Sequence, residues 1–181
     1  MNRREQILDT AAELFARHGF HGVSIADLGA ACGVTGPALY KHFRGKQAIL
    51  AAMLVGISEE LLTEGRRRVR QAADDKAALD ALVDWHVSFA LDHEALIVVQ
   101  DRDWAALPVE AREKVRETQR KYVEVWAKVL RSVRPDLKPR AARAMVHAAF
   151  GLINSTPHSA LLPAGEMSEV LARMARAALL S

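Results

Sequence analysis

The chain has 181 residues, of which 50% are hydrophobic and 26% charged, and its formal net charge is +3. This composition supports a buried core and lacks the low hydrophobicity and high net charge of disordered chains. The single cysteine, Cys32, excludes an intrachain disulfide and a zinc site built on cysteine. The amino terminus has no apolar signal-peptide core, and no apolar run approaches the roughly 18–20 residues of a membrane span, so we expect a cytoplasmic protein that does not contact a membrane.

A helical pattern of apolar residues begins at residue 3 and continues to residue 18. Gly19 then ends this helix, because glycine readily adopts positive φ. A second, short helix is predicted after Ser24, which is a favourable N-cap, and it ends at Gly33. The apolar stripes of the two helices consist of Ile7, Leu8, Ala11, Ala12 and Phe15, followed by Ile25, Leu28 and Cys32.

A third helix is predicted after Thr35, with Pro37 in its first turn, where a missing N–H has little cost. It ends near Gly45, and a longer fourth helix begins around Lys46 and reaches the basic run of residues 66–70. Positive charge at that end suits the helix dipole. We therefore expect a solvated helix end there, with binding of DNA or of an anionic effector as the alternative.

The rest of the chain repeats the helical pattern, with prolines at or near the breaks. Five further helices are predicted at about 76–92, 94–105, 108–133, 139–155 and 166–180. No convincing strand segment, internal repeat or low-complexity tract is present. The sequence therefore predicts an all-α, nine-helix protein, with a three-helix domain at residues 1–46 and a larger helical domain at residues 47–181.

Two short helices joined by a tight glycine-containing turn, after a longer packing helix, are typical of the helix-turn-helix motif. Leu39 and Phe43 are four residues apart, so they share the face that docks on the first two helices. Pro37 and Lys41 lie on the opposite face, which is small at its start and suits close entry into a major groove. A helix with a merely solvated face is the alternative.

Residues 3–54 resemble the amino-terminal domain of the tetracycline-repressor (TetR) family of bacterial regulators. The resemblance is close over about the first 50 residues and continues beyond them only as a matching layout of helices. The matching positions are Ile7, Ala11, Ala12, Leu14, Phe15, Gly19, Ser24, Ile25, Leu28, Gly29, Cys32, Gly33, Val34, Ala38, Leu39, Tyr40, His42, Phe43 and Lys46.

The resemblance implies a division of DNA contacts between the backbone and the bases. Positions that usually hold the DNA backbone are Thr35, Tyr40, Lys41 and His42, with Lys46 on a phosphate. Positions that face base edges are Gly36, Pro37 and Ala38. We add Ser24, at the start of the second helix, to the candidate DNA contacts.

The chain departs from the common family pattern at two positions. Gly36 replaces a long polar or basic side chain, and Ala26 replaces a basic reader that some members carry. Base discrimination is then expected from close backbone approach, from Pro37 and Ala38 against thymine methyls, from Tyr40 and from DNA shape. Arg3 and Arg4 are predicted to enter the adjacent minor groove, with a frayed, solvated terminus as the alternative.

The resemblance also implies a homodimer on a palindromic operator in double-stranded DNA, with recognition helices about 34 Å apart or a multiple of it. The last two predicted helices carry small and apolar stripes that suit close helix packing between two copies. An ordinary intramolecular core is the alternative. The stripes consist of Ala141, Met145, Ala148, Ala149 and Leu152, and of Val170, Leu171 and Met174.

Large aromatic side chains with a few polar groups fall on the predicted body helices, as they do in small-molecule pockets. Such a lining favours a hydrophobic or amphipathic effector, such as a lipid, a fatty acyl thioester, a sterol fragment or a drug. Each residue also has an ordinary role in a helical core, with His86 as a hydrogen-bonded core histidine. The candidates are His86, Phe89, Arg102, Trp104, Tyr122, Trp126, Phe150 and Asn154.

Taken together, the sequence predicts a DNA-binding transcriptional regulator, a repressor by resemblance, that a small molecule releases from its operator. One alternative is a DNA-binding protein without an effector, and another is a helical enzyme that uses His86 with Asp84 or Asp101 and Tyr122. No glycine-rich phosphate loop, nucleophile elbow or metal-ligand spacing supports the enzyme. We therefore predict no catalytic residues, no cofactor and no metal.

Overall fold

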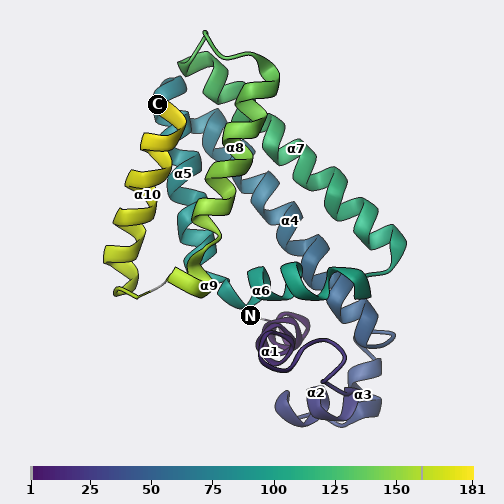
Figure 1. Ribbon diagram of the computed structural model, residues 1–181. Helices are drawn as coiled ribbons and strands as arrows, with labels where there is room; N and C mark the ends of the chain where they lie inside the picture. Colours follow the sequence, from purple (N-terminus) through teal and green to yellow (C-terminus); the bar gives the residue numbers. More distant parts are fainter. Residues whose placement is uncertain (1, 160) are drawn as a thin grey trace. The chain divides into compact units, whose positions relative to one another are not determined.

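A computed structural model describes residues 2–159 and 161–181 of the chain (Figure 1). Over these residues the fold is all-α, as predicted, with ten α-helices, one short 3-10 helix and no strand. The helix beyond the nine predicted is the four-residue α9. Within the same residues, no helix combines the length and the apolar character that crossing a bilayer requires.

The helices follow one another with short connections. Their bounds are α1 (Arg3–His18), α2 (Ile25–Ala31), α3 (Gly36–Tyr40), α4 (Lys46–Gln71), α5 (Asp75–Asp92), α6 (Glu94–Asp103), the 3-10 helix (Trp104–Ala106), α7 (Val109–Val133), α8 (Pro139–Ile153), α9 (Thr156–Ser159) and α10 (Ala164–Leu180).

The chain divides into two compact units. The first comprises Met1–Ile57 and Ala95–Arg116, and the second comprises Ser58–Glu94 and Glu117–Ser181, so α4 and α7 contribute to both. This division differs from the single boundary expected after residue 46. The reason is that Val99, Leu107 and Val115 join the core of the first unit, a contact between segments far apart in sequence that helical periodicity does not reveal.

The helices of the first unit begin where the sequence predicts them. The Ser24 side chain accepts a hydrogen bond from the Asp27 amide, and the Asp27 carboxylate accepts one from the Ser24 amide, which makes a capping box for α2. Thr35 caps α3 by accepting from the Ala38 amide at 3.4 Å. Gly33, between the two helices, has a φ of 65°, which a residue with a side chain adopts only with strain.

The turn between α2 and α3 also depends on a second glycine. The Val34 amide donates to the Gly29 carbonyl at 2.8 Å, which draws the chain after α2 back onto the helix. A Cβ on Gly29 would lie 2.9 Å from the Val34 carbonyl oxygen and 3.4 Å from the Gly36 nitrogen. Glycine at this position is therefore what permits the tight approach of the turn to α2.

In the second unit, α10 packs against α5 and α8 (Figure 1). Arg176 of α10 donates to Asp80 and Asp84 of α5, which ties the carboxyl-terminal helix to this unit. The Thr156 hydroxyl donates to the Ala90 carbonyl at 3.0 Å, which ties α9 to α5.

The two glycines Gly29 and Gly56 allow a matched test of the turn. In the Gly29→Ala variant the new methyl group meets backbone atoms, so we expect the free energy of unfolding to fall by about 1–3 kcal/mol. In the Gly56→Ala variant, nothing lies within 4 Å of the new Cβ, and alanine should raise the stability of α4 by about 0.5–1 kcal/mol. Urea unfolding of both variants measures the difference, and equal effects would contradict the packing described.

Candidate nucleic-acid interface and effector site

The docking of α3 leaves one of its faces in solvent. Leu39 is fully buried and Phe43 is 5% exposed, so both side chains enter the core of the first unit as predicted. On the other side Pro37 and Lys41 are exposed, and the Tyr40 ring is 55% exposed. A large aromatic side chain on a solvent-facing helix, beside a cation and a small first turn, suits a surface that contacts DNA.

Two residues predicted to contact DNA already have intramolecular partners. The Lys46 ammonium donates to the carbonyls of Phe20 and Val23, both at 2.7 Å, and so ties the start of α4 to the connection between α1 and α2. The Ser24 hydroxyl donates to the Asp27 carboxylate at 2.6 Å, and the Ser24 amide donates to the same carboxylate. These two hydrogen bonds lower the pKa of Asp27. Both side chains therefore hold the first unit together.

The two arginines near the amino terminus also contact the first unit itself. Arg3 donates to the Cys32 carbonyl at 2.8 Å, which links the start of α1 to the end of α2. The Arg4 guanidinium lies 4.9 Å from the centre of the Phe43 ring. In this arrangement the two side chains brace the helices and do not form an extended arm.

Two of the predicted effector contacts, Arg102 and Trp104, belong to the first unit and not to the unit that holds the others. Arg102 donates to the carbonyls of Phe15 and Ala16 in the last turn of α1, where the Phe15 carbonyl also accepts from the Gly19 amide. The Arg116 guanidinium lies 5.5 Å from the centre of the Trp104 ring. The structure thus gives Arg102 a capping role that sequence spacing could not show.

The other six predicted effector residues lie in the second unit, and five of them form one aromatic and polar cluster. The His86 ring stacks on Phe150, with centroids 4.4 Å apart and an interplanar angle of 7°. Trp126, which is fully buried, lies edge-on to both rings. His86 Nε2 is 3.1 Å from Asn154 Oδ1, and His86 Nδ1 is 3.3 Å from the Tyr122 hydroxyl. Phe89 packs at the edge of this cluster, 6.1 Å from His86 between ring centroids.

The cluster is uncharged at neutral pH. Burial lowers the pKa of His86 to about 4 and raises that of Tyr122. The enzyme alternative required a carboxylate beside His86, but the two ring nitrogens lie next to Tyr122 and Asn154, and Asp84 accepts a hydrogen bond from Arg176. Among the described residues, no group of three or more His, Cys, Asp or Glu side chains is arranged to hold a metal ion.

Gly65 of α4 also shapes this cluster, although the sequence did not predict it as a site residue. A Cβ at Gly65 would lie 2.6 Å from the Tyr122 ring, so the absence of a side chain lets Tyr122 pack directly on the α4 backbone. The available signal was a glycine inside an otherwise helical pattern, which often marks a close approach of another element.

The predicted dimer residues separate into two groups. Ala149 and Leu171 are 1% and 3% exposed, so they belong to the core of the chain itself. The other six residues are exposed or half-buried, and they leave an apolar face on α8 and α10. These six are Ala141, Met145, Ala148 and Leu152 on α8, and Val170 and Met174 on α10.

Two family models match most of the chain. Residues 7–53 match the model of bacterial regulatory proteins of the tetR family. Residues 72–158 match the model of the tetracyclin repressor-like carboxyl-terminal domain. The first match covers the helix-turn-helix, and the second covers α5 to α8 and part of α9.

Individual relatives and solved structures also point to the family that the two family models match. The HTH-type transcriptional repressor KstR2 of Rhodococcus jostii is 30% identical over 129 residues, which are 71% of this chain but only 63% of that relative. A TetR-family regulator from Bordetella parapertussis has a TM-score of 0.86 and 26% identity, covering 98% of this chain and 94% of that one. The regulator FadR from Bacillus subtilis, solved in complex with stearoyl-CoA, shares the fold with a TM-score of 0.73 and 19% identity, covering 94% and 96% of the two chains. The chain therefore belongs to the tetR family of bacterial regulatory proteins.

Proposed function

We propose that the chain is a DNA-binding transcriptional regulator, a repressor that binds a palindromic operator as a homodimer and that a hydrophobic or amphipathic small molecule releases. The observation that carries this proposal is the orientation of α3. Leu39 is fully buried while Tyr40, the next residue, is 55% exposed, so the helix presents a fixed outward face. Membership of a family of regulators agrees with this use of the face.

The outward face assigns different contacts to its two ends. At the start of α3, Gly36, Pro37 and Ala38 carry little side chain, so the backbone is expected to approach the base edges closely. The exposed residues that would contact the DNA backbone are Thr35, Tyr40, Lys41 and His42. Four other predicted DNA contacts would support this surface indirectly, because their side chains already contact other groups of the first unit. These are Lys46, Ser24, Arg3 and Arg4.

Dimerisation is proposed through the apolar face of α8 and α10. Met174 is 49% exposed on α10, and Ala141 and Ala148 are exposed on α8. Small residues permit close approach of helices, and a two-fold arrangement would place α8 and α10 of two copies in a four-helix interface. Ala149 and Leu171 would support this face from below.

The cluster around His86 is the proposed effector site. It offers apolar ring faces together with a neutral row of hydrogen-bonding groups, formed by Tyr122, His86 and Asn154. Such a lining suits an acyl chain that ends in a polar group, and FadR from Bacillus subtilis was solved with a ligand of this kind, stearoyl-CoA. The stacking of His86 directly on Phe150 favours the second candidate, a regulator with a filled body and no effector.

A pair of lysine variants tests the DNA surface. We expect Lys41→Ala to weaken binding to the operator and to unrelated duplexes alike, and to flatten the dependence of log affinity on log salt by about one unit, because one phosphate contact is lost. Lys138→Ala, which removes an exposed lysine before α8, serves as the control. Fluorescence anisotropy with the chain's own upstream DNA at several salt concentrations provides the measurement. Equal effects of both substitutions would contradict the proposed surface.

Stearoyl-CoA is a suitable probe to separate the two candidates. A regulator with an effector site should show a raised melting temperature with the probe and an operator affinity lowered by about 5–150-fold, the usual range of allosteric coupling. Free coenzyme A, which lacks the acyl chain, should leave the operator affinity unchanged. An unchanged melting temperature and operator affinity with stearoyl-CoA and with other long-chain acyl thioesters would favour the regulator without an effector.

A further inference from the structure

The second unit carries a groove outside the cluster around His86. It has a volume of about 430 Å³, is open to solvent and lies between residues of α4 and α7. A volume of this size is typical of small-molecule sites. Its lining consists of Arg66, Glu117, Arg120, Lys121, Glu124, Val125 and Lys128.

The two carboxylates of the groove already have cationic partners. The Lys121 ammonium donates to Glu117 at 2.6 Å. The Arg143 guanidinium, from α8, donates to the Glu124 carboxylate, with Nη2 at 3.1 Å from Oε2, and this hydrogen bond lowers the pKa of Glu124. The acidic charge of the groove is therefore compensated within the protein.

Three cations of the groove have no such partner. The side chains of Arg66, Arg120 and Lys128 are exposed and form no hydrogen bond or ion pair with any residue that the structure describes. The groove therefore carries an uncompensated positive charge on both of its walls, since Arg66 comes from α4 and the other two residues come from α7.

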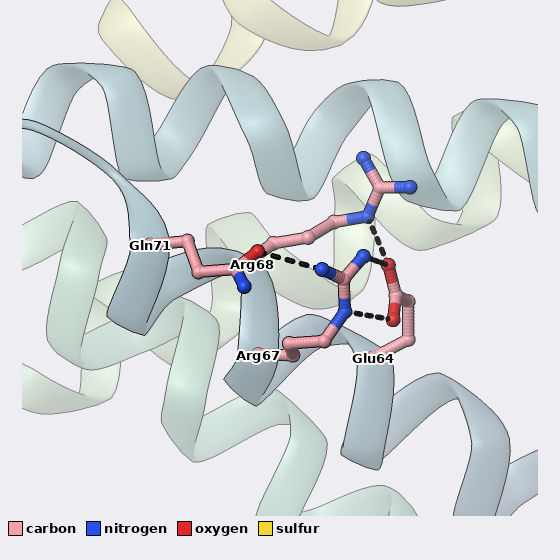
Figure 2. Close-up of polar contacts among 4 residues, drawn as sticks. All are labelled: Glu64, Arg67, Arg68 and Gln71. Carbon is pink, nitrogen blue, oxygen red and sulfur yellow. Dashed lines mark hydrogen bonds and ion pairs between the residues drawn. The ribbon is translucent and has the colours of Figure 1, made fainter.

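The basic run at the end of α4 explains why Arg66 remains uncompensated. The Glu64 carboxylate accepts hydrogen bonds from Arg67 and from Arg68 Nε at 2.7 Å, and Arg67 also donates to Gln71 (Figure 2). The hydrogen bond from Arg67 is the main reason that the pKa of Glu64 is lowered to about 2. Glu64, the acidic residue nearest to Arg66 on α4, therefore accepts from Arg67 and Arg68, and among the described residues the Arg66 guanidinium stays unpaired in the groove.

The spacing of the cations indicates the size of the ligand. Arg120 and Lys128 are eight residues apart, which corresponds to about 12 Å along α7. A single phosphate group is small relative to this row, so a ligand with two or more phosphate groups suits cations spread over both walls better. Guanidinium groups bind phosphate oxygens in pairs, and Val125 with the aliphatic stems of the basic side chains gives an apolar floor.

We propose that this groove binds a small molecule that carries two or more phosphate groups. A compact ligand is favoured over a DNA duplex because the paired carboxylates Glu117 and Glu124 interrupt the positive surface, and a continuous row of phosphates would pass over them. This inference does not depend on operator binding by α3 or on the cluster around His86.

Isothermal titration of the chain without DNA tests the proposal, with adenosine diphosphate and inorganic pyrophosphate as probes. We expect both probes to bind with a dissociation constant below about 1 mM, and adenosine, which has no phosphate, not to bind. The variants Arg66→Gln, Arg120→Gln and Lys128→Gln should each weaken binding by about tenfold.

The matched control is Arg70→Gln, which removes an exposed arginine of the same basic run that does not line the groove. It should leave both affinities unchanged, and thermal melting should show that all four variants are folded. The proposal is overturned if neither probe binds at about 1 mM, if Arg70→Gln weakens binding as much as Arg66→Gln, or if an unrelated duplex displaces adenosine diphosphate from the groove.

Discussion

The burial of Leu39 and Phe43 is the interaction on which the proposed regulator depends. α3 has only five residues, too few to be stable alone, so tertiary packing must hold it in place. Burying one leucine contributes about 1.5–3 kcal/mol, and the close approach of the turn at Gly29 fixes the direction of the helix. Because these contacts determine which side of α3 is buried, they also determine that Tyr40 and Lys41 face solvent.

The helix-turn-helix could be predicted from sequence because its signals are local. The caps at Ser24 and Thr35, the positive φ of Gly33 and the four-residue spacing of Leu39 and Phe43 all act within one or two helical turns. The family resemblance added the DNA contacts that geometry alone does not name. Those contacts remain predictions, although the structure leaves α3 free to make them.

The roles that sequence could not predict belong to long side chains with distant partners. Lys46 and Arg102 end at carbonyl groups 23–26 and 86–87 residues away, and no spacing rule connects such positions. Lys46 was expected to contact a phosphate because of the family resemblance, and Arg102 was expected to contact an effector as a polar group among the predicted aromatic residues. The rings of His86, Tyr122 and Trp126 lie together in the structure, and helical periodicity had placed them on apolar stripes of two predicted helices. Their neutral hydrogen-bonded row became evident only from the structure.

The most direct test of the central claim is to locate the DNA-binding surface by NMR. Backbone amide shifts of the chain should be recorded with and without a duplex from its own upstream region. We expect the largest changes on residues 35–42, with small changes at the buried Leu28 and Ile49. Large changes confined to other surfaces, with the amides of α3 unaffected, would show that α3 does not contact the DNA.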